Sequence, residues 1–392
     1  MSAFLALALA VVVLLLALSI HLTMPHYALM AVRVFASEVT PWLIVLALIA
    51  AALALAGLER GLVPRLAIGA AGLALVLAAI PLARAPGVIA DADRQLREAF
   101  GAEPDGRSSF SLVTSFLGLR APDVRVERDV AFDVVGGRLR LDRYALPGAT
   151  DGARPAIVVL HGGSWRGGDK GQRLTSTTEW SRTFAGHGFV VYDIQYRLAP
   201  AVHHPDPLRD VLCALAHVRA HADEDGVDPE RVVLIGRSAG AHLALLAAYR
   251  GRDAPCGPPA HVAGVVALYG PTDLLAAYAD PGDPDLIGGR SVLRDYIGGT
   301  PDDARENFLD AMPRTWLDGA VPTLLLHGDA DQIVYPRHSA DLAARLRDRG
   351  VPVVHLRLPW SGHSFDAISV GVGGQIALAT AERFVAEVIA RR

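Results

Sequence analysis

The first 85 residues contain three long apolar segments, and these constrain the fold more than any other feature of the sequence. Residues 3–18 have no polar side chain, residues 42–58 form a second such segment, and residues 66–83 form a third. A helix needs about 20 mostly apolar residues to cross the hydrocarbon core of a bilayer, where it satisfies its own backbone hydrogen bonds. We therefore expect residues 1–85 to be a membrane domain with three transmembrane helices and the lipid bilayer as a partner.

Two other interpretations of these segments stay open. The first segment would also suit a cleaved signal peptide, although residues 1–4 have no Lys or Arg and two more apolar segments follow. The other two would also suit buried helices of a soluble domain, although they have no polar face. Membrane spans explain the pattern better than either alternative.

Three spans would place the two ends of the chain on opposite sides of the membrane. The arginines near the membrane are Arg33, Arg84, Arg94 and Arg97 on the side of the C-terminal domain, and Arg60 and Arg65 on the other side. Cytoplasmic flanks carry an excess of Lys and Arg. The distribution therefore favours an integral, multi-pass membrane protein whose C-terminal domain is cytoplasmic.

Composition excludes several classes of protein. Hydrophobic residues make up 52% of the 392-residue chain, which excludes a disordered protein. The 37 basic and 41 acidic residues give a net charge of −4 with no basic run, which argues against nucleic acid as a partner. Only Cys213 and Cys256 are present, so we expect neither a disulfide framework nor a cysteine metal site, and the cysteines do not indicate a compartment.

Residues 86–122 are expected to connect the membrane domain to a C-terminal domain at residues 123–392. Within this connector, residues 91–100 have an apolar and a polar face, and residues 110–119 carry several large apolar side chains. Each of these two segments would suit either the headgroup layer of a membrane or the surface of the following domain.

From residue 123 onward, short apolar strands alternate with helices. We expect a hairpin of residues 124–134 and 138–145 around Gly136 and Gly137, and a turn at Pro229 and Glu230. Further strands are expected at residues 156–160, 189–194, 232–235, 262–268, 323–326 and 353–358, and helices at 174–186, 207–221, 239–250, 336–349 and 375–391. This order predicts a mostly parallel, doubly wound α/β sheet, whose ligands bind at the carboxyl ends of the strands.

The candidate nucleophile, Ser238, lies directly after one of these strands. It is the central residue of Gly236-Arg237-Ser238-Ala239-Gly240, a G-x-S-x-G sequence between an expected strand and an expected helix. The tight turn exposes the serine hydroxyl and places the next backbone N–H at a helix N-terminus, which favours an anion. An ordinary glycine-rich turn is the alternative.

A serine nucleophile needs a base and an orienting carboxylate, each in a loop after a later strand. His363, next to Gly362, is the candidate base. Asp331 is the candidate acid because it lies deeper in its loop than Asp329, the second choice.

The other histidines have simpler interpretations. His242 lies one helical turn beyond Ser238 and is expected to pack or to form a hydrogen bond, and His327 is expected to hold the acid loop. His203 and His204 would suit a metal only with a third ligand at zinc-like spacing, and the sequence has none nearby. We expect no metal site.

Residues 161–165 follow the strand at residues 156–160 and resemble a loop that stabilises an oxyanion. Donors must be aimed at the oxygen on which negative charge develops. The candidates are the backbone N–H groups of Gly162, Gly163, Ser164 and Ala239. Trp165 would either line the substrate pocket or belong to the core.

Five motifs together resemble the α/β-hydrolase superfamily, and the resemblance extends from about residue 123 to the C-terminus. The motifs are residues 161–170 (HGGSWRGGDK), 196–200 (YRLAP), 236–242 (GRSAGAH), 327–334 (HGDADQIV) and Gly362-His363. The chain is most similar to carboxylesterases of the feruloyl-esterase-like and hormone-sensitive-lipase-like branches. Ser164 stands where the lipase-like branch has a third glycine, which the feruloyl-esterase-like branch tolerates.

The resemblance implies a serine hydrolase with Ser238, Asp331 and His363 as a catalytic triad and without a metal or cofactor. The three apolar segments lie outside the family pattern and resemble plant isoprenylcysteine methylesterases, which join membrane helices to a similar domain. The leading hypothesis is therefore a membrane-anchored esterase acting on a small-molecule or lipid-like ester.

The long segment at residues 273–316 is expected to be part of a cap over the site. The alternatives are amide or peptide hydrolysis or acyl transfer by the same triad, and a binding module without catalysis.

Overall fold

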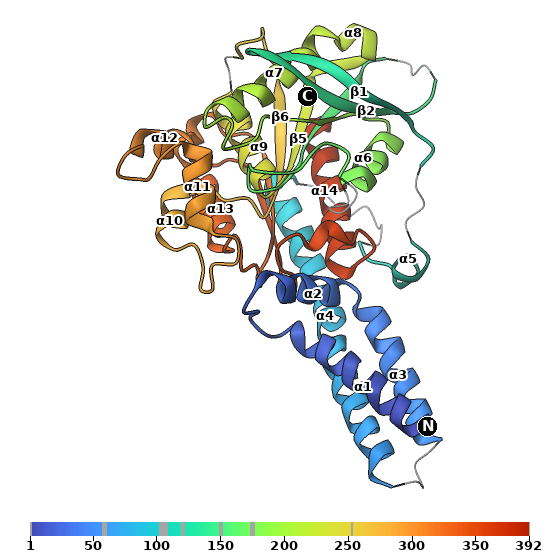
Figure 1. Ribbon diagram of the computed structural model, residues 1–392. Helices are drawn as coiled ribbons and strands as arrows, with labels where there is room; N and C mark the ends of the chain where they lie inside the picture. The colour runs from blue at the N-terminus through green and yellow to red at the C-terminus, as the bar shows by residue number, and fades with distance from the viewer. Residues whose placement is uncertain are drawn as a thin grey trace.

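The C-terminal part of the chain is built on an eight-stranded sheet. The computed structural model describes residues 2–56, 61–101, 109–118, 122–148, 152–172, 177–251 and 254–391. The strands are β1 (Arg125–Val134), β2 (Gly137–Ala145), β3 (Arg154–Leu160), β4 (Val190–Ile194), β5 (Val227–Arg237), β6 (Val262–Leu268), β7 (Thr323–Gly328) and β8 (Val353–Leu358). Their order in the sheet is β1-β2-β4-β3-β5-β6-β7-β8 (Figure 1). The hairpin β1–β2 and the pair β2–β4 are antiparallel, and the other neighbours are parallel.

Helices cover both faces of this sheet, as expected for strands joined by helical crossovers. The α-helices that follow α4 are α5 (Leu112–Leu117), α6 (Thr177–Gly186), α7 (Asp206–Ala220), α8 (Ala222–Asp225), α9 (Ala239–Arg250), α10 (Leu274–Ala279), α11 (Gly289–Ile297), α12 (Arg305–Asp310), α13 (Arg337–Asp348) and α14 (Val372–Ala390). Helices α7, α9 and α13 contribute to the core on one face, and α6 and α14 to the core on the other.

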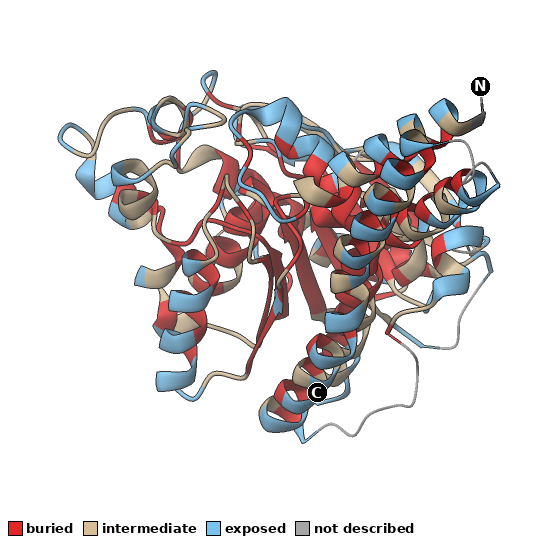
Figure 2. Cartoon of the chain, turned by 90° about the horizontal axis from the view of Figure 1, so that it is seen from below, coloured by how far each residue is buried: buried red, intermediate tan, exposed pale blue. Residues whose placement is uncertain are grey.

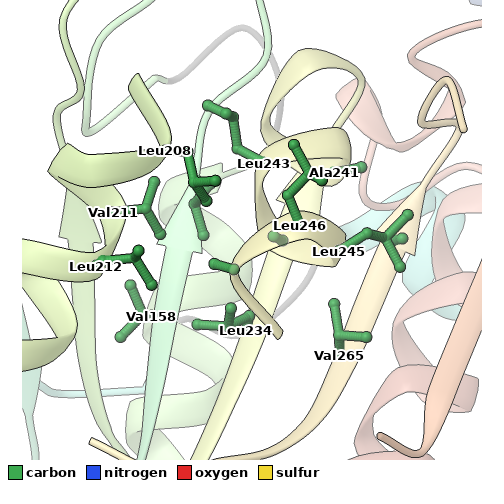
Figure 3. Packing of buried hydrophobic residues seen from close by; sticks show 14 of the residues in the cluster. Val158, Leu208, Val211, Leu212, Leu234, Ala241, Leu243, Leu245, Leu246 and Val265 are labelled. Atoms are coloured by element: carbon green, nitrogen blue, oxygen red, sulfur yellow. The ribbon is translucent and has the colours of Figure 1, made fainter. Parts of the chain in front are cut away.

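The core explains why the central strands are continuous apolar runs. All seven residues of β6 are buried, because a strand covered on both faces has no solvent side. On one face, leucines and valines of α7 and α9 pack against Val158, Leu234 and Val265 of β3, β5 and β6 (Figure 3). In Figure 2 the strands of the sheet are buried, whereas the helices around them are buried on the inner side and exposed on the outer side.

The predicted α/β architecture is confirmed, with one local correction. The hairpin, the six later strands and the five helices all form near their predicted positions. Pro229 and Glu230 were expected to form a turn ahead of a strand, but they lie inside β5. There the register against β3 shifts after Val227, so these residues form an irregularity within the strand. Some predicted positions lie outside the described residues: 57–58, Arg60, 102–108, 119–121 and 174–176.

Three N-terminal helices pack side by side and extend away from the sheet (Figure 1). They are α1 (Ser2–Ser19), α3 (Thr40–Leu55) and the first part of α4 (Leu62–Phe100). Small side chains fill their interface, which is one buried cluster of Ala6, Ala10, Ala50, Ala54, Ala67 and Ala71. Large apolar side chains point outward, among them Phe4, Leu15, Leu48, Leu66 and Val76. This bundle is therefore apolar on its outer surface.

The prediction of three membrane spans is not confirmed by the lengths of these helices. Among the described residues, α4 is long and apolar enough to cross a membrane. Helix α2 (Tyr27–Glu38) passes that test only together with α3, as a pair bent by 83°, and α1 is apolar but shorter. The 16 residues of α3 extend roughly 24 Å at 1.5 Å per residue, less than a hydrocarbon core of about 30 Å.

The predicted boundary between membrane domain and connector at residue 85 falls inside α4. This helix has 39 residues and continues through Pro81 and Pro86. Its second half covers the sheet: the side chain of Gln95 donates to the carbonyl of His355 in β8 at 3.0 Å and accepts from the N–H of the same residue at 2.8 Å. The amphipathic segment at residues 91–100 therefore packs on the following domain, which was one of its two predicted interpretations.

The structure corrects the expectation for the cysteines. Cys213 in α7 and Cys256, which follows α9, form a disulfide across 43 residues of sequence. Two cysteines so far apart in the sequence give no spacing motif, so only the packing of α7 near the end of α9 brings them together.

Candidate active site

The turn between β5 and α9 holds Ser238 in a strained conformation. Its φ is 51° and its ψ is −117°, a region that L residues rarely adopt. Gly236 and Gly240 make the turn possible. A Cβ atom on Gly240 would lie 2.3 Å from the carbonyl oxygen of His161, and one on Gly236 would lie 2.3 Å from the carbonyl oxygen of Gly240. The close approach of these backbones explains why the sequence has glycine on both sides of the serine.

The structure brings together the three predicted triad residues. The Oγ atom of Ser238 lies 3.0 Å from Nε2 of His363, and Nδ1 of His363 lies 2.7 Å from Oδ2 of Asp331. In the tautomer that fits both contacts, the serine hydroxyl donates to Nε2 and the N–H at Nδ1 donates to the carboxylate. These residues come from the ends of β5, β7 and β8, so the carboxyl edge of the parallel sheet assembles them.

Both carboxylate oxygens of Asp331 have hydrogen-bonding partners. Its Oδ1 atom accepts from the N–H groups of Ile333 at 2.8 Å and Val334 at 3.0 Å. Burial alone would raise the pKa of Asp331, but the charge of His363 and the hydrogen bonds from His327 and His363 hold that pKa well below its usual range. The carboxylate is therefore ionised and oriented toward the imidazole.

Asp329, the second candidate acid, lies in a different environment. Both of its carboxylate oxygens accept from the guanidinium of Arg357 at 2.9 Å. It forms an ion pair on β8 and has no described contact with His363. The geometry therefore favours Asp331 over Asp329 as the partner of the histidine.

The loop after β3 lies against the serine turn. A Cβ atom on Gly162 would be 3.4 Å from Cβ of Ser238, which shows how closely the two segments approach. Gly163, Ser164 and Trp165 all have positive φ values, of 126°, 55° and 56°. Within the described part of the chain, the N–H groups of all four predicted donors, Gly162, Gly163, Ser164 and Ala239, have no backbone hydrogen-bond acceptor. Unpaired donors beside the serine hydroxyl suit an oxyanion.

Trp165 belongs both to the core and to a pocket wall, which joins its two predicted interpretations. Its ring stacks on Tyr296 with centroids 4.3 Å apart, and it lines a mainly apolar pocket with Val292, Leu293 and Val334 among others. Tyr296, Val292 and Leu293 belong to α11, one of three helices inserted between β6 and β7.

These inserted helices, α10 to α12, form a cap that is attached to the loop after β3. The guanidinium of Arg166 donates to Oγ of Ser291 at 2.7 Å and contacts the carboxylate of Asp295 at 2.5 Å. The predicted segment at residues 273–316 therefore contacts the loop that carries the oxyanion-hole candidates, through Arg166.

A buried ion pair next to the triad was not predicted from the sequence. Arg237 donates from Nε to Oδ2 of Asp366 at 2.5 Å, and both side chains are almost completely buried. The hydroxyl of Tyr269 donates to the other oxygen of Asp366 at 2.5 Å. Because Arg237 precedes Ser238 and Asp366 follows His363 by three residues, this pair ties the serine turn to the histidine loop. The residue types alone gave no signal for it.

The remaining histidines have structural contacts. The Nε2 atom of His242 lies 2.7 Å from the carbonyl oxygen of Ala311, and burial lowers its pKa to about 3. The ring of His327 lies 2.9 Å from the carbonyl oxygen of Val334, so it holds the acid loop as predicted. His203 and His204 contact Asp295 and Asp310 of the cap. Among the described residues, no group of three His, Cys, Asp or Glu side chains could hold a metal ion.

Comparisons with known proteins find esterases among the relatives of this chain. The chain is 31% identical to the "Probable carboxylic ester hydrolase LipM" of Mycobacterium tuberculosis over 68% of this chain and 62% of that protein. It is 31% identical to "Esterase LipC" of the same organism over 58% of this chain and 57% of that protein. The matches thus span about 60% of the length of these relatives.

A solved fungal esterase from Rhizomucor miehei has the same fold. It superimposes with a TM-score of 0.57 and 21% identity, covering 78% of this chain and 97% of that chain. The family model BD-FAE matches residues 141–346, which include Ser238 and Asp331 and make up more than half of the sequence. The chain therefore belongs to the BD-FAE family of α/β-hydrolases.

Proposed function

We propose that this protein is a membrane-anchored serine hydrolase that cleaves carboxylic esters through an acyl-enzyme. The observation that carries the proposal is the hydrogen-bonded chain from Ser238 through His363 to Asp331. A serine hydroxyl becomes an effective nucleophile when an oriented imidazole can accept its proton. The names of the related mycobacterial proteins, an ester hydrolase and an esterase, support ester rather than amide substrates.

In the first half of the reaction, Ser238 Oγ attacks the ester carbonyl carbon while His363 Nε2 takes the hydroxyl proton. Negative charge then develops on the carbonyl oxygen, and the N–H groups of Gly163, Ser164 and Ala239 would stabilise it. Asp331 keeps the imidazole in the tautomer that accepts at Nε2 and stabilises the imidazolium. When the tetrahedral intermediate collapses, the proton on Nε2 passes to the leaving alcohol oxygen and the acyl group stays on Ser238.

In the second half, water replaces the alcohol. His363 takes a proton from the water, the resulting hydroxide attacks the acyl carbon, and the proton returns to Ser238 as the carboxylic acid leaves. The apolar pocket between Trp165 and the cap would hold the acyl chain or the alcohol of the ester.

Membrane anchoring by α1, α3 and α4 is part of the proposal. In lipid, helices associate through small residues at their interface and present large apolar side chains to the acyl chains. The buried alanine cluster and the outward-facing leucines and phenylalanine of the bundle support that arrangement. The bundle would bring an ester that partitions into the bilayer close to the catalytic domain.

Two observations support opposite sides of the membrane for the catalytic domain. Four arginines against two favour the cytoplasmic side, whereas the Cys213–Cys256 disulfide favours an oxidising, non-cytoplasmic compartment. An excess of two arginines is small, so we give the disulfide more weight and propose the non-cytoplasmic side. In sealed inside-out vesicles, external protease should then leave the domain intact; digestion would support the cytoplasmic side.

The catalytic proposal is tested with full-length protein in detergent. It should hydrolyse p-nitrophenyl butyrate, cleave the matching anilide far more slowly, and react with a fluorophosphonate probe. Ser238→Ala and His363→Ala should each lose nearly all turnover while the protein stays folded, and Ser238→Ala should not be labelled. A wild-type protein that neither turns over esters nor reacts with the probe would support a binding module instead.

The anchoring proposal is tested by extraction of membranes. The protein should stay in the membrane fraction at high salt and alkaline pH and be released by detergent, because only detergent replaces the acyl chains around the bundle. Release by alkaline carbonate alone would contradict anchoring.

A further inference from the structure

Helix α2 lies directly against the two loops that carry His363 and Asp331. It joins α1 to α3 and lies where the bundle meets the catalytic domain (Figure 1). Two charged residues of α2, Arg33 and Glu38, are buried, with 5% and 1% of their surfaces exposed. Burying a charged side chain is unfavourable unless it is fully hydrogen-bonded, so the partners of these two residues indicate what they do.

Glu38 holds the histidine loop. Its Oε1 atom accepts from the hydroxyl of Ser361, two residues before His363, at 2.8 Å. Its Oε2 atom accepts from the N–H groups of Gly373 at 2.7 Å and Gly374 at 3.2 Å, in the first turn of α14. One carboxylate therefore fixes both the start of the histidine loop and the helix that follows it.

Arg33 holds the acid loop. Its Nη1 atom donates to the carbonyl oxygen of Ala330, directly before Asp331, at 2.6 Å. Its Nε and Nη2 atoms donate to the carbonyl oxygen of Ile20, directly after α1, at 3.3 and 3.1 Å. The side chain of Gln332, directly after Asp331, also exchanges two hydrogen bonds with the backbone of Met24, both 3.0 Å long.

The acid loop and the histidine loop are also hydrogen-bonded to each other, which completes a closed path of contacts that begins and ends on α2. The N–H of Ala330 donates to the carbonyl oxygen of Ser361 at 3.1 Å. The path thus leads from Arg33 to Ala330, on to Ser361 and back to Glu38. Gly362 packs closely beneath α2, since a Cβ atom there would lie 3.1 Å from Cγ2 of Val34.

We propose that Arg33 and Glu38 are positioning residues for the catalytic histidine and aspartate, so that the membrane-proximal helix completes the active site of the hydrolase domain. This inference rests on the proposed hydrolase function. Neither residue contacts the reacting atoms. Glu38 acts through the Ser361 side chain, and Arg33 acts through the Ala330 carbonyl and through its charge, which interacts with that of Asp331. A misplacement of about 1 Å in a catalytic group costs about 100-fold in rate, so loss of either contact should lower kcat.

The test measures steady-state hydrolysis of p-nitrophenyl butyrate by full-length variants in detergent. Glu38→Ala and Arg33→Met should each lower kcat by about 10- to 100-fold and change KM less than about twofold, because the substrate pocket beside Trp165 is not altered. Glu38→Gln keeps one acceptor oxygen for the N–H groups of Gly373 and Gly374, and its NH2 group can donate to the Ser361 hydroxyl oxygen, so this variant should recover part of the lost kcat. Ser37→Ala is the matched control on the same helix, because among the described residues the Ser37 hydroxyl donates within α2, to the carbonyl of Val34.

A double-mutant cycle separates positioning from a general loss of stability. If Glu38 acts through Ser361, the double variant Glu38→Ala/Ser361→Ala should be about as slow as the slower single variant. Fully additive losses would contradict action through Ser361. Each variant is checked by its thermal unfolding midpoint, so that rates are compared only between folded proteins.

Hydrogen exchange gives a readout that does not need turnover. In Glu38→Ala and Arg33→Met, backbone amides of residues 327–334 and 359–366 should exchange faster than in Ser37→Ala. Wild-type kcat and unchanged exchange in both variants would overturn the proposal while leaving the hydrolase function intact. A wild-type protein without turnover would instead refute the hydrolase function, and exchange in the two loops would then still decide whether α2 holds them.

Discussion

Replacement of Asp331 by asparagine tests the proposed chain of hydrogen bonds most directly. The backbone N–H groups of Ile333 and Val334 already hold one oxygen of this side chain, at 2.8 and 3.0 Å. An amide has only one oxygen, and those two donors keep it, so the NH2 group faces Nδ1 of His363. The imidazole must then accept at Nδ1 and carry its proton on Nε2, where it cannot take the proton of Ser238.

The size of the effect follows from this change of tautomer. The same Asp-to-Asn substitution in a serine protease of this mechanism lowers kcat by about 10⁴-fold. At 1.36 kcal/mol per factor of ten, this corresponds to about 5.5 kcal/mol of transition-state stabilisation. The expected loss for Asp331→Asn is therefore about four orders of magnitude in kcat. The assay is p-nitrophenyl butyrate hydrolysis by full-length protein in detergent.

Asp329→Asn is the matched control two residues earlier in the same loop. It breaks only the partly exposed ion pair with Arg357, which is worth at most about 1 kcal/mol of stability, and it should leave kcat within about twofold of the wild type. The reasoning is refuted if Asp331→Asn keeps more than about a tenth of the wild-type kcat, or if Asp329→Asn is the variant that loses activity.

Three further predictions concern stability. Gly240→Ala should prevent stable folding or lower the unfolding free energy by about 3 kcal/mol or more in urea, because its Cβ would lie 2.3 Å from the carbonyl oxygen of His161. Reduction of the Cys213–Cys256 disulfide should cost about 4 kcal/mol, from the chain entropy of a loop of 43 residues, and an unchanged melting temperature in reductant would contradict this. Burial raises the pKa of Asp193 from 3.8 to about 7, so the folded state is favoured most below about pH 4, where Asp193 is protonated, and this stability is lost as the pH rises through 7. Asparagine cannot ionise. Thermal unfolding should therefore show Asp193→Asn to be more stable than the wild type at pH 8 but not at pH 4.

The sequence predicted the sheet well because its signals are local. A strand buried on both faces must be a short continuous apolar run, and β6 begins and ends at the predicted residues 262 and 268. The serine turn was also predictable, because close backbone contacts demand glycine at two fixed positions around Ser238. The base and the acid followed from the order of loops after strands, and the structure brings both within hydrogen-bonding distance.

Features that depend on long-range packing escaped sequence reasoning. The cysteines come together only through the arrangement of α7 and α9. The boundary at residue 85 was placed by a change from apolar to amphipathic composition, but α4 continues through it because one end packs in the bundle and the other on β8. Arg237 and Asp366 are 129 residues apart, and nothing in either local sequence indicates the partner.

The amino-acid sequence by itself determined the alternation of strands and helices, the serine turn and the apolar character of the N-terminal helices, because each depends on residues that are neighbours in the chain. Only the tertiary structure decided that Arg33 and Glu38 contact loops about 300 residues away. The physical reason is that a buried charged group needs hydrogen-bond partners, and tertiary packing decides which groups these are. The local sequence of α2 does not indicate which loops lie beside it.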